Sequence, residues 1–305
     1  RQKAELIESI LMGIPIPLMY LFEDKNGKKQ VVDGRQRISA ILDFLEGKFK
    51  LNNLRILKQF NGCCFADLDL KQQGVIEDFQ LLFYIIQPPT PERVKYDIFD
   101  RVNRGGTPLN KQEMRNALYR GRCTRMLDKL CCSPEFLIAT GRSINKERMK
   151  DQYVVLRAMA FLMLHRGEFK DIPALQYRGD IDDFLARFMV YVNDNAPEKL
   201  IVDYENLFIR CMQISYDLLG ENGFRFSGNG IRRPINMPLF EALSYLFSFV
   251  PEKIDYTWAS RLILDIESVK EEFDDSRYFS GNIDSTTSVS FRFDRMDKII
   301  NRIQL

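Results

Sequence analysis

The sequence predicts an α+β protein in which a small mixed α/β domain is followed by a mostly helical domain. Two observations carry this prediction. Signals for strands and hairpins occur only before residue 90. From about residue 122 onward, long runs with apolar residues at helical spacing replace them. We therefore expect one domain over residues 1–121 and a helical domain over residues 122–305.

The composition is that of a globular protein and excludes several classes. Of the 305 residues, 45% are hydrophobic and 28% are charged, and the formal net charge is only +2. Bulk charge therefore does not indicate a nucleic-acid-binding protein, although a local basic patch stays open. No apolar run reaches the roughly 20 residues that a membrane span needs. The six cysteines include two adjacent pairs and no C-x-x-C, so we expect reduced thiols in a cytoplasmic protein, without disulfides or a zinc site.

The first domain begins with a helix and a hairpin. Four apolar residues share one helical face: Leu6, Ile7, Ile10 and Leu11. The next run, IPIPLMYLF over residues 14–22, is extended, and its two prolines favour a strand at the edge of a sheet. Asn26-Gly27 predicts a turn that returns the chain as a second strand over residues 29–32.

A second helix and a second extended region come next. Apolar residues at helical spacing over 38–45 predict the helix, so a strand, a tight turn and a helix start meet in QVVDGRQRIS, residues 30–39. Asn61-Gly62 indicates another hairpin. The run FQLLFYIIQPP over residues 79–89 is typical of an apolar strand, ended by two prolines.

Helices are predicted from there to the end of the chain. Thr90-Pro91-Glu92 is typical of a helix start, and NRGG at residues 103–106 ends that helix. Asn110 and Glu113 form a capping box for the next helix, which ends at Gly121. The amphipathic runs of the second domain cover residues 146–166, 180–194, 198–219, 236–250, 256–272 and 291–303.

The first candidate site is the turn Asp33-Gly34-Arg35-Gln36-Arg37. Asp33 and Gln36 have the spacing of a capping box, which needs no ligand. Capping does not explain Arg35 and Arg37, because the start of a helix disfavours cations unless an anion is bound there. Residues two apart on a helix point about 200° from each other. We therefore expect one arginine to face a ligand and the other to pair with a neighbouring carboxylate, with phosphate binding and plain capping equally open.

A second candidate site lies at Gly105-Gly106, between a helix end and a helix start. A glycine cap followed by a turn explains the glycines on structural grounds. It does not explain why polar donors crowd this junction: Arg101, Asn103, Arg104, Arg115 and Asn116. Such donors suit phosphate, ribose or base edges. Taken alone, this segment is better explained by the structural alternative.

Four segments share a pattern with a known family: ELIESILMGIPIPLMYL, VVDGRQRISAILDFLEG, IFDRVNRGGTPLNKQEMRNALYRG and RRPINMPLFEALS. Together they resemble the N-terminal domain of GmrSD-type, modification-dependent restriction endonucleases, which is related to the ParB/sulfiredoxin-like fold. The resemblance implies a ParB/sulfiredoxin-like fold for residues 1–121 and a helical domain after it. The family signature Asp-Gly-Gln-Gln-Arg is matched except at its third position: Asp33, Gly34, Gln36 and Arg37 agree, and Arg35 replaces the first Gln.

The resemblance implies that this motif binds a nucleoside triphosphate and, in relatives, supports its hydrolysis. The catalytic candidates are Asp33, Gln36 and Arg37, with Asp33 capping the turn or helping to place Mg²⁺ or water. The candidates for phosphate binding are Gly34, Arg35, Arg37, Arg101, Asn103, Arg104, Gly105 and Gly106. Arg35 adds a cation that suits phosphate binding. Because it replaces the first Gln of the signature, the choice of nucleotide and the ability to hydrolyse it stay open.

Family enzymes that cut DNA often carry a His-Asn-His nuclease domain, whose metal chemistry needs histidine. The chain has one histidine, His165, near the end of an apolar helix, where a packed side chain or a partner of the helix dipole is expected. No such nuclease is therefore expected within these residues. A separately encoded nuclease subunit becomes a candidate partner.

Two main functions remain open. The leading hypothesis is a regulatory or sensor module of a phage-defence or modification-dependent restriction system, which binds and in one version hydrolyses a nucleoside triphosphate. The alternative is a non-catalytic module for DNA binding or protein interaction, with the same arginines on DNA phosphates. Arg232 and Arg233 are separate candidates for nucleic-acid contact, against a solvated loop. A weaker third direction is ATP-dependent thiol repair, which lacks a cysteine beside the Asp33 turn. No metal site, P-loop or dinucleotide fingerprint is predicted.

Overall fold

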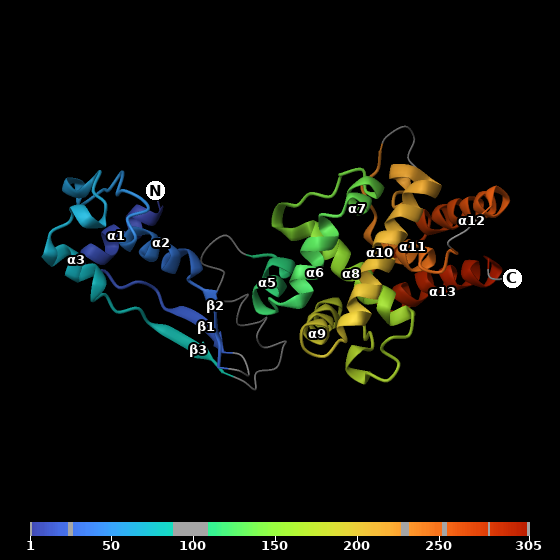
Figure 1. The fold of residues 1–305 in the computed structure, drawn as a ribbon, viewed down its shortest axis with the longest axis horizontal. Helices are drawn as coiled ribbons and strands as arrows, with labels where there is room; N and C mark the ends of the chain where they lie inside the picture. The colour runs from blue at the N-terminus through green and yellow to red at the C-terminus, as the bar shows by residue number, and fades with distance from the viewer. Residues whose placement is uncertain are drawn as a thin grey trace. The chain divides into compact units, whose positions relative to one another are not determined.

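The computed structural model describes residues 2–23, 27–87, 109–226, 232–251, 255–279 and 281–303 (Figure 1). The chain forms two compact units, Arg1–Pro108 and Leu109–Leu305. The first contains a small mixed sheet with helices, and the described part of the second is helical. The predicted α+β class is therefore confirmed. The helix predicted after Asn110 belongs to the second unit by this division.

The sheet of the N-terminal unit has three short strands in the order β2-β1-β3. They are β1 Met19–Glu23, β2 Lys29–Asp33 and β3 Phe83–Ile86. β1 pairs antiparallel with β2, as the hairpin signal predicted, and parallel with β3. The register places Asp33 opposite Tyr20, and Met19 opposite Phe83. The end of β2 thus lies beside the beginning of β1, and β3 begins at the same end of the sheet.

Two sequence-based expectations about this unit are wrong. β1 is the central strand and not an edge strand, since it pairs with both β2 and β3. Pro15 and Pro17 do not prevent this, because they precede Met19 and leave the hydrogen-bond ladder intact. The hairpin expected at Asn61-Gly62 is also absent from the described residues. The segment forms short helical elements there: two 3₁₀ turns, Lys58–Phe60 and Phe65–Asp67, and the helix α3, Leu70–Glu77. Gly62 has φ 89° and donates its N–H to Leu51 O at 2.7 Å, so Asn61-Gly62 forms a turn that does not connect two strands.

The core of the N-terminal unit is formed by helices. α1 (Gln2–Leu11) packs against α2 (Arg35–Leu45) and α3. The buried cluster consists of Ala4, Ile7, Ile10, Ile41, Phe44, Leu51, Leu54, Leu68 and Ile76. Each large apolar side chain buried in this way stabilises the fold by about 1.5–3 kcal/mol. Glu8 is buried beside this cluster, and its Oε1 accepts the N–H groups of Ile56 and Leu57 at 2.8 Å each. Burial raises the pKa of Glu8, but these backbone donors outweigh it and lower the pKa overall.

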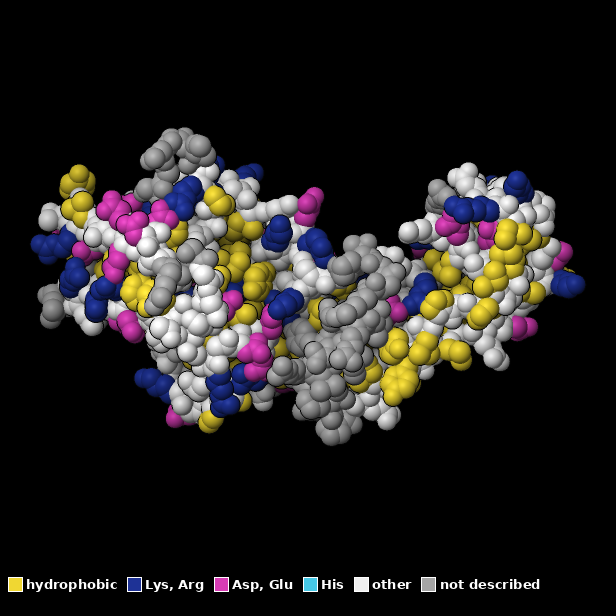
Figure 2. Space-filling view, turned by 180° about the vertical axis from the view of Figure 1, so that it is seen from behind, with side chains coloured by type: hydrophobic (Ala, Val, Ile, Leu, Met, Phe, Trp, Pro, Cys, Tyr) yellow, Lys and Arg dark blue, Asp and Glu magenta, His cyan; other side chains and the backbone are white. Residues whose placement is uncertain are grey.

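The sheet also presents apolar side chains to the surface. Leu82 and Tyr84, at and just before β3, are 65% and 59% exposed. Hydrophobic side chains gather on the face of the N-terminal unit shown in Figure 2. Tyr84 packs across the strands against Tyr20, with ring centroids 6.0 Å apart.

Nine helices are described in the C-terminal unit. They are α5 Lys111–Leu118, α6 Arg122–Cys131, α7 Pro134–Ala139, α8 Lys150–His165, α9 Ile181–Asp194, α10 Glu198–Leu219, α11 Met237–Phe247, α12 Tyr256–Asp274 and α13 Thr286–Ile303. α8 and α11 pack together at the centre, with α13 and α10 against α11 (Figure 1). Within the described residues, none of the helices is both long and apolar enough to cross a membrane.

Each predicted run of the helical domain coincides with one of the helices α8 to α13; the ends agree for α10 and are shifted for the others. α13 begins at Thr286 and not at residue 291, because the Ser285 hydroxyl accepts the N–H of Ser288 at 3.1 Å. The capping box of α5 is confirmed: Asn110 Oδ1 accepts the N–H of Glu113 at 2.9 Å, and Glu113 Oε2 accepts the N–H of Asn110 at 2.7 Å. The helices α3, α6 and α7 are additions that the sequence patterns do not predict.

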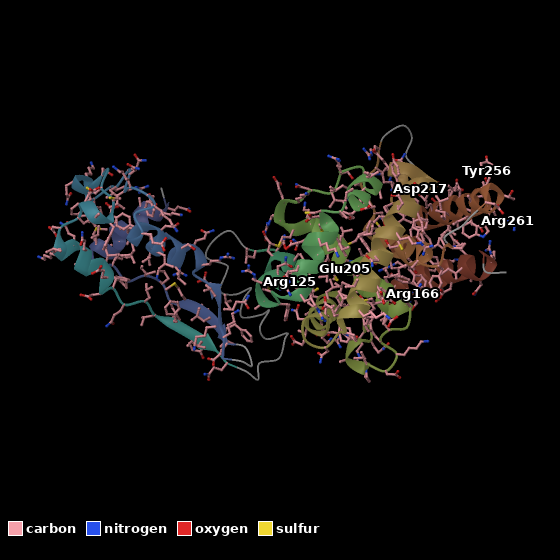
Figure 3. All side chains as sticks on the ribbon, in the orientation of Figure 1. Arg125, Arg166, Glu205, Asp217, Tyr256 and Arg261 are labelled. Carbon is pink, nitrogen blue, oxygen red and sulfur yellow. The ribbon has the colours of Figure 1, made fainter. Side chains whose placement is uncertain are left out.

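Polar side chains connect segments of this unit that are distant in the sequence, among them Glu205 and Arg166 (Figure 3). Glu205 on α10 accepts from Lys129 on α6, where these two helices pack together. Arg166, directly after α8, donates to Ser248 O at 3.2 Å and lies over the Phe249 ring at 4.7 Å. These contacts fix helices that are distant in the sequence.

An ionic cluster lies in the core of the C-terminal unit. Glu241 on α11 is fully buried and accepts from two buried arginines, Arg157 on α8 and Arg292 on α13. The distance from Arg292 to Glu241 Oε2 is 2.7 Å. Arg157 also donates to Asp284 Oδ1 at 2.6 Å. Burial lowers the pKa of Arg157, but the facing carboxylates outweigh it and keep this guanidinium charged. Two carboxylates thus balance two guanidinium groups.

Candidate functional site

The first candidate site lies where β2 ends at Asp33 and α2 begins at Arg35. Gly34 between them is the N-cap residue of α2 and has φ 94°, in the left-handed region. A Cβ on Gly34 would lie 2.5 Å from Met19 Cγ, so both the backbone conformation and the close approach of Met19 require glycine. Gly34 O accepts the N–H of Ile38 at 2.9 Å, which begins the helix.

The capping box expected from Asp33 and Gln36 is not formed. Asp33 precedes the N-cap residue, and no side chain among the described residues caps α2. Asp33 Oδ2 accepts instead from Arg37 at 2.5 Å, and the same guanidinium donates to Pro17 O at 2.5 Å. The expectation that one arginine pairs with a neighbouring carboxylate is therefore confirmed, and that arginine is Arg37. These two bonds connect α2 to the end of β2 and to the segment before β1.

Arg35 is the second cation of this turn, and it is exposed together with Gln36. Among the described residues, Arg35 forms no ion pair. One carboxylate against two guanidinium groups leaves one net positive charge at the turn. The N–H groups of the first turn of α2 add the positive end of the helix to it. The site is therefore basic, open to solvent and suited to an anion.

Only part of the second predicted site lies among the described residues. Arg101, Asn103, Arg104, Gly105 and Gly106 lie outside the described residues. The other two residues of that junction make internal contacts. Arg115 is 1% exposed in its side chain and pairs with Asp182 Oδ1 at 2.8 Å, while Asn116 donates to Gln152. They therefore belong to the packing of α5 against α8 and α9.

Arg232 and Arg233 stay predictions as nucleic-acid contacts, and both form ion pairs. Arg232 donates to Glu221 Oε2 at 2.7 Å, and Arg233 pairs with Asp274. Their neighbour Arg225 is a residue that the sequence patterns do not single out. It is 4% exposed and donates to carbonyl groups, including Thr140 O at 3.2 Å, without a carboxylate partner in the described part of the chain. No sequence signal distinguishes it from a surface arginine.

His165 lies at the end of α8 as a packed side chain, as expected. Its ring stacks on Phe293 with centroids 3.6 Å apart, and Tyr245 packs edge-on against it. Its Nε2 is buried and has no hydrogen-bond partner among the residues that the structure describes. Burial, aided by the charge of Arg292, lowers the pKa of His165 to about 3, so the ring is neutral. Over the part of the chain that the structure describes, no group of three or more His, Cys, Asp or Glu side chains is arranged to hold a metal ion.

Fold and site define a small α/β unit with a basic helix start, joined to a helical unit. Residues 1–120 match the family described as GmrSD restriction endonuclease, N-terminal domain. This segment contains the turn at residues 33–37, so the N-terminal unit is similar to the N-terminal domain of that family of restriction endonucleases. Neither the curated proteins nor the solved structures provide a match.

Proposed function

We propose that the N-terminal unit binds a nucleoside triphosphate at residues 33–37, as the sensor or regulatory module of a modification-dependent restriction or phage-defence system. The family match of residues 1–120 supports the restriction setting. The observation that carries the ligand is Arg35, exposed and without an ion pair among the described residues, at the uncapped N-terminal end of α2. A cation is unfavourable there without an anion and favourable with one.

Each residue of the turn has a distinct role in this proposal. The backbone N–H groups of the first turn and the Arg35 guanidinium bind phosphate oxygens. Gly34 lets the strand turn sharply into the helix. Arg37, held by Asp33 and by Pro17 O, fixes the turn, and its guanidinium exchanges the Pro17 carbonyl for a phosphate oxygen when the ligand is bound. In this proposal, the second carboxylate oxygen of Asp33 and the exposed Gln36 orient Mg²⁺ or water for a slow phosphoryl transfer.

A second candidate function is DNA binding by the same turn, without hydrolysis. The observation that favours it is the internal ion pair of Arg37. Within the described residues, it leaves Arg35 as the single unpaired guanidinium of the turn, and one arginine with a helix N-terminus is enough to hold one backbone phosphate. Arg232 and Arg233, in the other unit, would then be additional phosphate contacts.

Titration calorimetry separates the two functions. ATP and GTP with Mg²⁺ are titrated into the wild type, Arg35→Ala, Arg37→Ala and the control Lys71→Ala, which removes one exposed charge from α3 of the same unit. We expect Arg35→Ala to weaken binding about tenfold, as for the loss of one charge-assisted hydrogen bond. Lys71→Ala is expected to bind like the wild type. Phosphate release measured on the same proteins tests hydrolysis.

The DNA alternative predicts a different pattern. A DNA duplex would bind with an affinity that falls steeply with salt, and added triphosphate would not displace it. Equal triphosphate affinity in the wild type, Arg35→Ala and Arg37→Ala would contradict the proposed site. Circular dichroism of Arg37→Ala is needed beside the titration, because this variant also loses two internal hydrogen bonds.

A further inference from the structure

A cavity of about 440 Å³ lies in the C-terminal unit, between α7, the start of α8 and the connecting loop 140–149. Its volume is within the range of small-molecule sites, about 300–1,000 Å³. Phe136 and Leu137 on α7 and Ile144 in the loop form its apolar walls. None of the functions considered above uses this cavity.

The charged groups of the cavity are arranged in two layers. Arg142 and Lys146 lie at the exposed rim, and neither forms an ion pair among the described residues. Asp151, on the first turn of α8, lines the cavity and is only 7% exposed. In the described part of the chain, its carboxylate takes one hydrogen bond, from the N–H of Gln152 to Oδ1 at 2.8 Å. A buried carboxylate with so few partners is costly unless a donor pairs with it.

The loop that carries the rim is held in a defined shape. Its backbone has φ values of 52° at Arg142 and 57° at Met149, an uncommon conformation for residues with a Cβ. Arg142 N–H donates to Leu137 O at 2.8 Å, and Asn110 Nδ2 donates to the carbonyl of Arg148 at 2.6 Å. The rim is therefore preorganised, which reduces the entropy lost when a ligand binds.

Further cations lie behind the rim. The buried Arg225 donates to Thr140 O and to Ser143 Oγ at the start of the loop. The guanidinium of Arg232 lies against Gly141, where an added Cβ would meet its NH2 at 2.0 Å. Arg232 pairs with Glu221, but Arg225 has no carboxylate partner among the described residues. The loop also carries the carboxylate of Glu147, which accepts from Asn145 Nδ2 at 2.9 Å. The three cations Arg142, Lys146 and Arg225 exceed the two carboxylates Glu147 and Asp151, and the remaining positive charge favours a phosphate.

From this arrangement we propose that the cavity binds one nucleotide, as a nucleoside monophosphate or as an unstacked nucleotide of a single strand. Arg142 and Lys146 hold the phosphate, the apolar walls contact the base, and Asp151 accepts a hydrogen bond from a base N–H or amino group. The walls and the buried carboxylate distinguish this cavity from the open basic turn at residues 33–37. It is a second, independent site, in the other unit of the chain.

The test uses the full chain in the Arg35→Ala background, which removes the phosphate-binding guanidinium from residues 33–37 without breaking an internal hydrogen bond. AMP, GMP, CMP, UMP and inorganic phosphate are titrated by calorimetry into this protein and into versions with Arg142→Ala, Lys146→Ala or the control Lys199→Ala on α10. Each rim substitution is expected to weaken monophosphate binding about tenfold. The control, which removes an equal charge from an exposed position of the same unit, is expected to leave it unchanged.

Two further measurements test the base and the source of the nucleotide. Asp151→Asn keeps the side-chain shape, so we expect phosphate affinity to stay the same while the preference among the four bases changes. If a short single-stranded oligonucleotide binds more tightly than the monophosphates, and its binding depends on Arg142, the ligand is a nucleotide within a strand. If the monophosphates bind more tightly than the oligonucleotide, the ligand is a free nucleotide. Inorganic phosphate binding as tightly as the nucleotides would overturn the proposal, as would binding that is unchanged in Arg142→Ala and Lys146→Ala.

Discussion

The single histidine of the chain gives the protein a predictable dependence of stability on pH. In the folded protein the pKa of His165 is about 3, because burial and the charge of Arg292 disfavour the charged ring. In the unfolded chain it is about 6.5. The unfolded chain therefore binds a proton below pH 6.5 that the folded protein does not bind. Stability is complete above pH 6.5 and falls as the pH decreases towards 3.

The size of the effect can be worked out from the two pKa values. Each pH unit between them lowers the free energy of unfolding by about 1.4 kcal/mol. We expect the protein to be about 2 kcal/mol less stable at pH 5 than at pH 7 from this residue alone. Carboxylates with lowered pKa, such as Asp182, lose their contribution only at lower pH, below the ordinary value of 3.8. The window from pH 7 to 5 therefore isolates His165.

Urea denaturation at pH 7, 6 and 5 measures this difference for the wild type and for His165→Gln, which cannot be protonated. The variant is expected to be less stable at pH 7, because it loses the stacking on Phe293, but nearly independent of pH in this window. The imidazole proton resonances, which come from one residue, give a direct check. A midpoint near pH 6.5 in the folded protein would refute the reasoning, as would a pH dependence that is equal in the variant.

Three further predictions concern stability. Glu241→Gln leaves two buried arginines without their shared carboxylate and should lower the free energy of unfolding by about 3–5 kcal/mol. Asp284→Asn, at the edge of the same cluster, should lower it by less, and urea denaturation of both variants measures the difference. Gly34→Ala should cost about 2 kcal/mol or more because it combines a positive φ with a steric clash. Gly47→Ala, with a positive φ but open space, should cost less in the same thermal melt. Asn110→Ala removes a formed capping box and should cost about 1 kcal/mol; an unchanged melting temperature would contradict its role.

The parts of the fold that could be predicted depend on neighbours in the sequence. The capping box at Asn110 and the amphipathic helices α8 to α13 follow from local spacing, and both are present. The central position of β1 depends on its parallel pairing with β3, some 60 residues later, which no local pattern contains. Asn61-Gly62 does not lead to a hairpin, because a turn signal reverses the chain without specifying whether a strand or a helix comes next. The short helices α3, α6 and α7 offer too few turns for a clear period.

The candidate site shows the same limit at the scale of single side chains. From the sequence, Asp33 can either cap the helix or pair with Arg37, and both alternatives are local. Gly34 decides between them, since its left-handed conformation makes it the N-cap residue and leaves Asp33 one position too early. Arg225 could not be found at all, because its partners are mainly backbone carbonyls, which every residue carries, and one of them belongs to Thr140 in a distant segment.

The buried ionic cluster has a consequence for how the C-terminal unit folds. Arg157, Glu241 and Arg292 come from three helices that span more than half of that unit. An intermediate with α8 and α13 in place but without α11 would bury two guanidinium groups without Glu241, which costs several kcal/mol. Partly formed states are therefore disfavoured, and the three helices should melt in one cooperative transition. A chain shortened before α13 would lose Arg292 and the packing of α13 against α11, and the remaining helices should be less stable.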